Sequence, residues 1–435
     1  ALDEHPGTEL DFTPFADPDV ESLHENGLSW TAPLPSQAAL ARVTSALGAR
    51  TPAHDIAWPV GETLSAGTLA ELVRQGTRTV VVGEASLPGN DNLRSTTNAL
   101  SPVRTRAGAA RAAVTSSTIQ KYVTGVLEPG APGVGELPQL VSEVAIRAVQ
   151  SLHDSHFVVI TGPRYVNPDP PTAARAILAT ADTFWSRSLP LRAASTTVSP
   201  VERGPLRAQH NHPDLPADTV NSIAYVKRSV PAMASMFTPA DASALLGPLP
   251  AAAQRAASSG LLGDPGRSIA ESAKLAAGIK RLLNGVSLVK PANGTYTLTA
   301  SDSSVPITIK NTLGVETHVR ISAHAENGLP GFTADSVPAR RIAAGSTQQV
   351  NIPTHIVRTG RIQVVVLLST PAGMPLGNEL ALTVRGTALG TVGVAITTAA
   401  GVVLVVALLL RTIGYLRRRN TPRPPVREPD DVTAS

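Results

Sequence analysis

Seven acidic, aromatic and basic residues have the side-chain types expected of a carbohydrate cleft. Each follows a stretch that the sequence predicts to be a strand, and they are Asp17, Asp19, Trp58, Glu62, Glu84, Arg164 and Tyr165. Clustered carboxylates beside aromatic rings suit a ligand cleft for sugars, where a carboxylate can serve as general acid or base. The sequence leaves an alternative open, in which these side chains are solvated loop residues, helix caps and proline-fixed turns.

Other catalytic or metal chemistry has little support in the sequence. The chain has no cysteine, which excludes disulfides, thiolate catalysis and Cys-based metal sites. His210, His212 and Asp214 could approach one ion, but they lie in a predicted loop and no further fixed ligand is evident. Because Gly-x-Ser-x-Gly, phosphate-loop and dinucleotide motifs are also absent, we predict no catalytic residue, no bound metal and no cofactor.

Alternating strands and helices position the seven candidates within residues 1–200. The hydrophobic pattern predicts strands over residues 10–15, 56–58, 79–83, 157–161 and 189–193, and helices over residues 37–47, 66–75, 140–152 and 172–185. Repeated strand–helix units favour a parallel sheet or a barrel. Ligand sites in such α/β folds gather at the carboxyl ends of the strands, which is where the candidates fall.

Two further regions follow this α/β region. Residues 217–284 are rich in Ala and Leu at helical spacing and predict a small helical subdomain. Residues 285–386 alternate apolar and polar side chains with a period of two and are divided by Gly- and Pro-containing turns, which predicts an Ig-like β-sandwich.

A membrane span is the strongest physical signal in the chain. Residues 389–410 carry no charge and, at about 1.5 Å per helical residue, would cross a hydrocarbon core of about 30 Å. Arg411 and the arginines at 417–419 follow, so we expect a single-pass plasma-membrane protein with a cytoplasmic tail at 411–435 and an extracytoplasmic N-terminal part. No export signal opens the chain, and we expect it to be a mature form or a part of a longer protein.

Net charge argues against nucleic acid as a partner. Lys and Arg number 37 against 33 Asp and Glu, a formal charge of +4. Six of the arginines and three of the acids lie after residue 410, which leaves the preceding chain almost neutral. A broad nucleic-acid surface needs a concentrated positive patch.

The first region resembles polysaccharide-deacetylase (NodB-like) barrels. The resemblance rests on residues 39–48, 55–62, 69–76 and 79–82, and on the segment Thr13-Pro-Phe-Ala-Asp-Pro-Asp-Val20, which is similar to the metal motif of that family. Thr13 and Asp17 stand where that motif has its two metal histidines. After residues 157–160, where the family has a catalytic His, this chain continues Thr161-Gly-Pro-Arg164. The resemblance therefore implies a degenerate barrel without its metal ligands, a pseudoenzyme.

The whole layout also resembles an uncharacterised family of actinobacterial envelope proteins, often encoded beside the lipid II flippase. The similarity rests on residues 15–20, 56–59, 162–168 and 382–390. It implies a membrane-anchored, non-catalytic protein that binds a cell-wall glycan or a partner in envelope assembly, such as that flippase. The alternative is a divergent hydrolase or deacetylase acting on cell-wall glycan.

Overall fold

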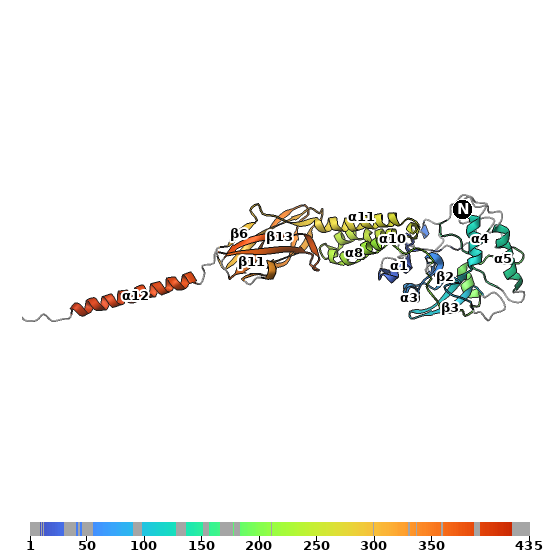
Figure 1. The fold of residues 1–435 in the computed structure, drawn as a ribbon, viewed down its shortest axis with the longest axis horizontal. Coiled ribbons are helices and arrows are strands. Elements are labelled where there is room, and N and C mark those ends of the chain that lie inside the picture. Colours follow the sequence, from blue (N-terminus) through green and yellow to red (C-terminus); the bar gives the residue numbers. More distant parts are fainter. Residues whose placement is uncertain are drawn as a thin grey trace, which may run out of the picture. The chain divides into compact units, whose positions relative to one another are not determined.

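The computed structural model groups the chain into two compact units (Figure 1). It describes residues 9, 11, 13–29, 41, 44–45, 55–89, 98–127, 136–150, 156–165, 177, 183–209, 211–298, 300–328, 331–335, 337–357, 360–386 and 392–419. The first unit comprises residues 1–234 and 239–282, and the second comprises residues 235–238 and 283–435. The α/β region and the helical region predicted from the sequence thus lie together in one compact unit.

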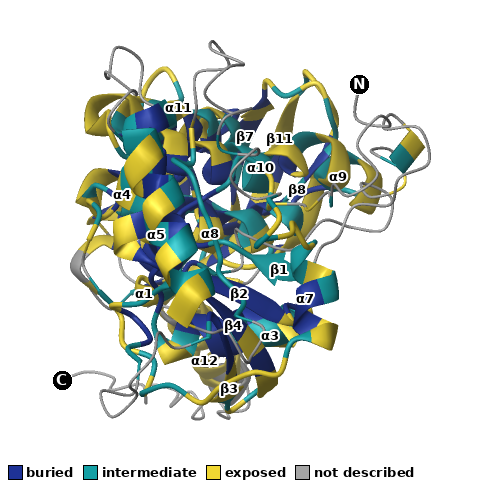
Figure 2. Ribbon diagram, turned by 90° about the vertical axis from the view of Figure 1, so that its right-hand side faces the viewer, coloured by how far each residue is buried: buried dark blue, intermediate teal, exposed yellow. Residues whose placement is uncertain are grey.

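A four-stranded sheet organises the α/β part of the first unit. Its strands are β1 (Ile56–Ala57), β2 (Thr79–Gly83), β3 (Leu100–Thr105) and β4 (Gly108–Thr115), in the order β1-β2-β4-β3. Strands β1, β2 and β4 run parallel to one another, and β3 joins β4 as an antiparallel hairpin. Strand β2 and the second half of β4 are buried and dark blue in Figure 2. The valine run of β2 is typical of a parallel strand covered on both faces.

Helix α3 (Ala66–Gln75) was predicted from the sequence to the residue, and its ends explain why. The Ser65 side chain accepts a hydrogen bond from the Thr68 N–H, and Gly76 ends the helix at a φ of 114°. Its buried leucines Leu69 and Leu72 belong to one apolar cluster with Val80 and Val82 of β2. Amphipathic spacing and packing against the sheet therefore agree.

Two more helices stand beside this sheet. Helix α4 (Ser117–Leu127) follows β4 directly, and α5 (Glu136–Gln150) packs against it. Ile119, Val123, Leu140 and Val144 form their shared core. The sequence predicted a helix over 140–152, whereas α4 and the β3–β4 hairpin were not predicted.

Several sequence-based strand predictions are corrected by the structure. Residues 189–193 were predicted as a strand, but helix α7 (Leu191–Thr197) begins there, because Pro190 fixes a helix start and the following alanines favour it. In residues 157–161, Val159 makes only an isolated parallel bridge to Thr115. The described residues of 10–15 form no strand beyond a bridge residue at Asp11. The predicted helices at 37–47 and 172–185 lie mostly outside the described residues.

Helices fill the remainder of the first unit; those within residues 217–284 were predicted, whereas the helix over residues 20–25 was not. They are α1 (Val20–Glu25), α8 (Ala217–Ala234), α9 (Pro239–Leu246), α10 (Pro248–Ala256) and α11 (Pro265–Asn284), with a short 3-10 turn η4 (Ser259–Leu261). Three of these helices open on a proline, whose fixed φ suits the first helical turn. Ile223 and Val226 of α8 and Ile279 of α11 are completely buried, which confirms the apolar faces expected at helical spacing.

The second unit contains two mainly antiparallel sheets. One has the order β10-β8-β12-β13-β6 and the other β5-β7-β11-β9. The strands are β5 (Val286–Val289), β6 (Thr295–Leu298), β7 (Asp302–Asn311), β8 (Thr317–Ala325), β9 (Phe332–Ala334), β10 (Val337–Ile342), β11 (Thr347–Ile356), β12 (Gly360–Ser369) and β13 (Pro375–Gly386). The buried pairs Val350–Ile307 and Ile352–Val305 between β11 and β7 alternate with exposed neighbours. The period-two pattern is confirmed, and the Ig-like class remains a prediction.

An apolar helix, α12 (Val392–Arg419), closes the described chain. Its segment Ile396–Tyr415 is long and apolar enough to cross a membrane, and its side chains are exposed to the surroundings. Length and composition thus agree with the predicted span, although the helix continues beyond residue 410. Its orientation across a membrane remains a prediction.

Candidate functional site

The carboxyl edge of the parallel strands carries a hydrogen-bonded network of polar side chains. Trp58 follows β1 directly and precedes the 3-10 turn η3 (Val60–Glu62), and Thr115 is the last residue of β4. Parallel strands bring these ends to one side of the sheet. We call this group the edge network; it comprises Asp17, Trp58, Glu62, Thr115, Gln120, Arg164, Tyr165 and Ser259.

Glu62 forms one half of the edge network. Its carboxylate is buried, with 4% of the residue exposed. Oε2 accepts a short hydrogen bond from Thr115 Oγ1, while Oε1 accepts from Gln120 Nε2 at 3.1 Å and from Trp58 Nε1 at 3.3 Å. Three donors from β4, α4 and the β1 end therefore hold both carboxylate oxygens, which is what a buried carboxylate requires.

Asp17 forms the other half. The Arg164 guanidinium donates to both carboxylate oxygens of Asp17 from Nε and Nη2, a bidentate ion pair. Ser259 Oγ donates to Asp17 Oδ2 at 2.7 Å, and the Tyr165 hydroxyl bonds to Ser259 Oγ at 2.6 Å. Asp17 thus ties residues 161–165 to the turn η4 of the helical region.

One contact joins the two halves. The Arg164 guanidinium carbon lies 5.0 Å from the centroid of the Trp58 ring, within the range of a cation–π interaction. The indole N–H of the same Trp58 donates to Glu62. Arg164 and Trp58 therefore connect the Asp17 and Glu62 carboxylates through one continuous set of side chains.

Backbone bonds reinforce the attachment to the helical region. Ser259 N donates to Asp17 O at 2.9 Å, and Asp19 N donates to Ala257 O at 2.9 Å. Pro18 and Ser258 form an antiparallel bridge between these bonds. The segment around Asp17 is consequently fixed to a part of the chain more than 200 positions away.

The edge network also holds strained backbone. Among the residues that the structure describes, the non-glycine residues with positive φ are Ala16 at 61°, Asp17 at 48° and Glu62 at 55°. Each such residue costs about 1–3 kcal/mol, and such strain persists where surrounding contacts over-determine it, often at functional sites. Two of the three are the carboxylates of the network, so the side-chain bonds and the strained backbone occur together.

The two remaining predicted carboxylates cap helices. Asp19 is completely buried at the N-cap of α1, where it accepts from Ser22 N at 3.2 Å and Ser22 Oγ at 2.6 Å. Glu84 follows β2 and accepts from Ser117 N at 2.9 Å and from the Ser117 hydroxyl at the start of α4. Both therefore match the alternative interpretation, in which the predicted acids are helix caps.

The suspected histidine loop is described only in part. His210 lies outside the described residues, and His212 Nδ1 is 3.8 Å from Asp19 Oδ2. The neighbouring Asn211 donates to the Gly61 carbonyl at 2.6 Å. Within the described part of the chain, no three His, Asp or Glu side chains come together as ligands for a metal ion.

The structure thus unites five of the seven sequence candidates and adds three residues that sequence reasoning missed. Asp17, Trp58, Glu62, Arg164 and Tyr165 share the edge network, whereas Asp19 and Glu84 do not. Thr115 was missed because β4 was not predicted from its alanine-rich sequence. Gln120 was missed with helix α4, and Ser259 has no local signal because it lies 242 positions from Asp17.

Comparison with protein families identifies one match over nearly the whole chain. Residues 5–430 match a family of unknown function (DUF6049), and the chain belongs to this family. No curated protein matches the chain.

Solved structures show only partial similarity. WR4, an MSP family member of C. elegans, is 9% identical, with 24% of this chain and 99% of that one covered and a TM-score of 0.18. The ASH/PapD-like domain of human CEP192 is 14% identical over 24% of this chain and 86% of that one, with a TM-score of 0.18. A FixG-related protein from Vibrio parahaemolyticus is 7% identical over 24% of this chain and 95% of that one, with a TM-score of 0.19.

Proposed function

We propose that this member of the DUF6049 family is a membrane-anchored, extracytoplasmic, non-catalytic protein that binds a cell-wall glycan or a partner in envelope assembly. One observation carries the proposal. Every carboxylate suspected of catalysis accepts fixed hydrogen bonds from the protein itself, at Asp17, Asp19, Glu62 and Glu84. We infer that the barrel-like region keeps the scaffold of a deacetylase and uses its acids to hold that scaffold together.

Acid–base catalysis fits these carboxylates poorly. A general acid or base must reach the proton that it transfers, and a glycosidase places two carboxyl groups on opposite sides of the scissile bond. Glu62 is 4% exposed and both its oxygens already accept hydrogen bonds. Asp17 is engaged by a bidentate guanidinium. The rival function, a divergent hydrolase or deacetylase, would require these bonds to break when substrate binds.

Exposed aromatic rings favour binding at the same place. Phe15 and Tyr165 are 54% and 59% exposed, and each lies within two positions of the Asp17–Arg164 pair. An aromatic ring offers an apolar face with little loss of side-chain entropy, while the adjacent charged pair offers donors and acceptors for hydroxyl groups. This combination supports recognition of a polyhydroxylated ligand such as a glycan.

The predicted membrane helix determines where the protein lies in this proposal. Helix α12 has the length and composition of a membrane span, and Arg411 with the arginines at 417–419 follows its apolar part. Positive residues of this kind stay on the cytoplasmic side. Along the chain, the two sheets of the second unit, which we infer to be an Ig-like module, come between the first unit and this helix.

The test titrates the full chain in detergent micelles with solubilised peptidoglycan and arabinogalactan fragments by calorimetry. We expect binding that falls at least ~10-fold in Tyr165→Ala, because loss of a central aromatic contact costs about 2 kcal/mol. Phe184→Ala is the matched control, since Phe184 is 99% exposed and packs edge-on against Trp185 outside the edge network. Absence of glycan binding, together with absence of an envelope protein in crosslinking from cells, contradicts the proposal.

The same fragments test the rival function. They are incubated with the wild-type chain and with Asp17→Asn and Glu62→Gln, and released sugars and acetate are measured. Product that depends on either carboxylate establishes catalysis and removes the non-catalytic assignment.

A further inference from the structure

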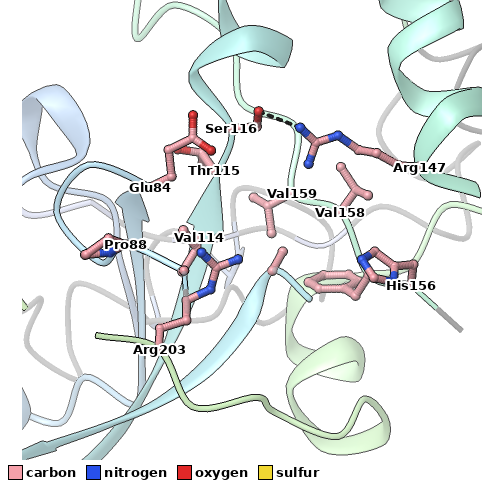
Figure 3. A pocket seen from close by; sticks show the side chains of 13 residues that line it. Glu84, Pro88, Val114, Thr115, Ser116, Arg147, His156, Val158, Val159 and Arg203 are labelled. Carbon is pink, nitrogen blue, oxygen red and sulfur yellow. Dashed lines mark hydrogen bonds between the residues drawn. The ribbon is translucent and has the colours of Figure 1, made fainter. Parts of the chain in front are cut away.

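A cavity that shares Thr115 with the edge network lies between β4, residues 156–159 and helix α5 (Figure 3). Its volume is about 310 Å³, at the lower end of the range for small-molecule sites. Apolar side chains form one wall, and they include Val114, Phe157, Val158 and Val159. Polar side chains also line it, and they include Arg147, Arg203, Ser116 and Glu84. The cavity therefore offers both charged and apolar side chains.

Two guanidinium groups point toward this cavity from different parts of the chain, as Figure 3 shows. Arg147 is on α5, and its Nη2 donates to Ser116 Oγ at 2.9 Å. Arg203 lies after α7 and donates from Nε and Nη2 to the Asn98 carbonyl, at 3.3 and 2.9 Å, and from Nη1 to the Leu87 carbonyl at 3.4 Å. The backbone carbonyls thus orient the Arg203 guanidinium.

The electrostatics of these arginines favour an anion. Burial lowers the pKa of Arg203; the charge of Glu84 opposes this effect, and the positive charge of Arg147 adds to it. An anion that accepts hydrogen bonds from Arg203 would offset the desolvation that lowers this pKa.

The acids near the cavity limit the charge that the ligand can carry. Glu143 pairs with Nε and Nη2 of Arg147 but does not line the cavity. Glu84 does line it, with one carboxylate oxygen held by Ser117 at the start of α4. A doubly charged phosphate would meet Glu84 as well as the arginines, whereas a single carboxylate adds one negative charge and suits the planar guanidinium fork.

We propose that this cavity binds a carboxylate carrying a short apolar group. The carboxylate would lie between Arg147 and Arg203, and the apolar group would contact Val114, Val158 and Val159. A branched-chain acid or the carboxyl terminus of a peptide ending in an apolar residue has this chemistry. The cavity borders the edge network at Thr115, but Tyr165 and Phe15, which carry the proposed glycan binding, do not line it. Its ligand would be held by charge at one end and by burial of apolar surface at the other.

The experiment measures binding to the full chain in detergent micelles by saturation-transfer NMR titration. The probes are isovalerate as a free acid, N-acetylvaline as a chain end, isovaleramide as the uncharged analogue and inorganic phosphate as the other anion. We expect saturable binding of at least one carboxylate, and which of the two binds more tightly identifies the source. Comparable binding of isovaleramide, binding of phosphate alone, or binding of none of the probes overturns the proposal.

Variants test the two arginines. Arg203→Lys and Arg147→Lys keep the charge but lose the fork, and we expect each to weaken carboxylate binding at least ~10-fold. Arg74→Lys is the control, because Arg74 forms an exposed pair with Glu71 on α3 and does not line the cavity. Unchanged affinity in both cavity variants, or equal loss in the control, contradicts the assignment.

A measurement on the wild-type chain covers the case in which a variant fails to fold. Phenylglyoxal modifies accessible arginines, and modified peptides are quantified by mass spectrometry with and without the carboxylate. We expect protection of Arg147 and Arg203 while Arg74 reacts as before. Equal modification of all three with and without ligand overturns the proposal.

Discussion

Replacing Arg164 by Gln tests whether the edge network holds the first unit together. Arg164 makes two charge-assisted hydrogen bonds to Asp17 and lies over Trp58. Gln keeps much of the length of the side chain but removes its charge and the bidentate fork. The Asp17 carboxylate would keep its hydrogen bonds from the Ser259 and Tyr165 hydroxyls.

The magnitude follows from the burial of the pair. A hydrogen bond to a charged group contributes about 1.5–3 kcal/mol when it is buried. The side chains of Arg164 and Asp17 remain 16% and 19% exposed, so solvent screening favours the lower end for each of the two bonds. We therefore expect the free energy of unfolding of the first unit to fall by about 3 kcal/mol, with a midpoint shift of about 6–12 °C.

The assay is thermal and urea unfolding of the full chain in micelles, followed by circular dichroism and tryptophan fluorescence. A double-mutant cycle with Asp17→Asn isolates the pair, and we expect a coupling free energy of about 2 kcal/mol. Arg74→Gln breaks the exposed Arg74–Glu71 pair and should change stability by less than about 0.5 kcal/mol. A loss below about 1 kcal/mol in Arg164→Gln with no coupling to Asp17 would refute the tethering role.

Three further perturbations test the remaining structure. Leu69→Ala removes a fully buried side chain between α3 and β2 and should destabilise the first unit by about 3 kcal/mol in urea unfolding; an effect below about 1 kcal/mol contradicts the packing. In the second unit, the hydrogen bond from His355 holds the pKa of the Asp302 carboxyl below its ordinary value. The stabilisation from this pair is therefore present above the pKa that Asp302 has in the unfolded chain, and it is lost as the pH falls through the lowered pKa of the folded chain. His355→Gln should return the Asp302 pKa, measured by NMR titration, toward the ordinary value, and an unchanged pKa excludes the pair as the cause. Because the chain has no cysteine, Gln348→Cys should react with an impermeant maleimide on intact cells and Ser435→Cys only after permeabilisation; the reverse pattern refutes the proposed orientation.

The sequence was sufficient to predict the helices and strands whose determining residues lie within a few positions of one another. Helix α3 and strand β2 were predicted to the residue, because a serine cap, a terminal glycine and a run of valines each act on their own neighbourhood. The apolar span and the period-two strands of the second unit were likewise predicted from local sequence patterns. The β3–β4 hairpin was missed, because the alanine-rich β4 has few of the β-branched residues that indicate a strand.

The edge network was decided by tertiary structure. The sequence placed Trp58, Glu62 and Arg164 near strand ends, but it could not show that Asp17 bonds to a serine 242 positions away or that Glu62 is enclosed by donors from β4 and α4. Hydrogen-bond partners depend on distance in space, and for residues far apart in the chain the sequence separation does not determine that distance. The same carboxylates that suggested catalysis in the sequence are therefore, in the folded chain, the acceptors that hold the scaffold together.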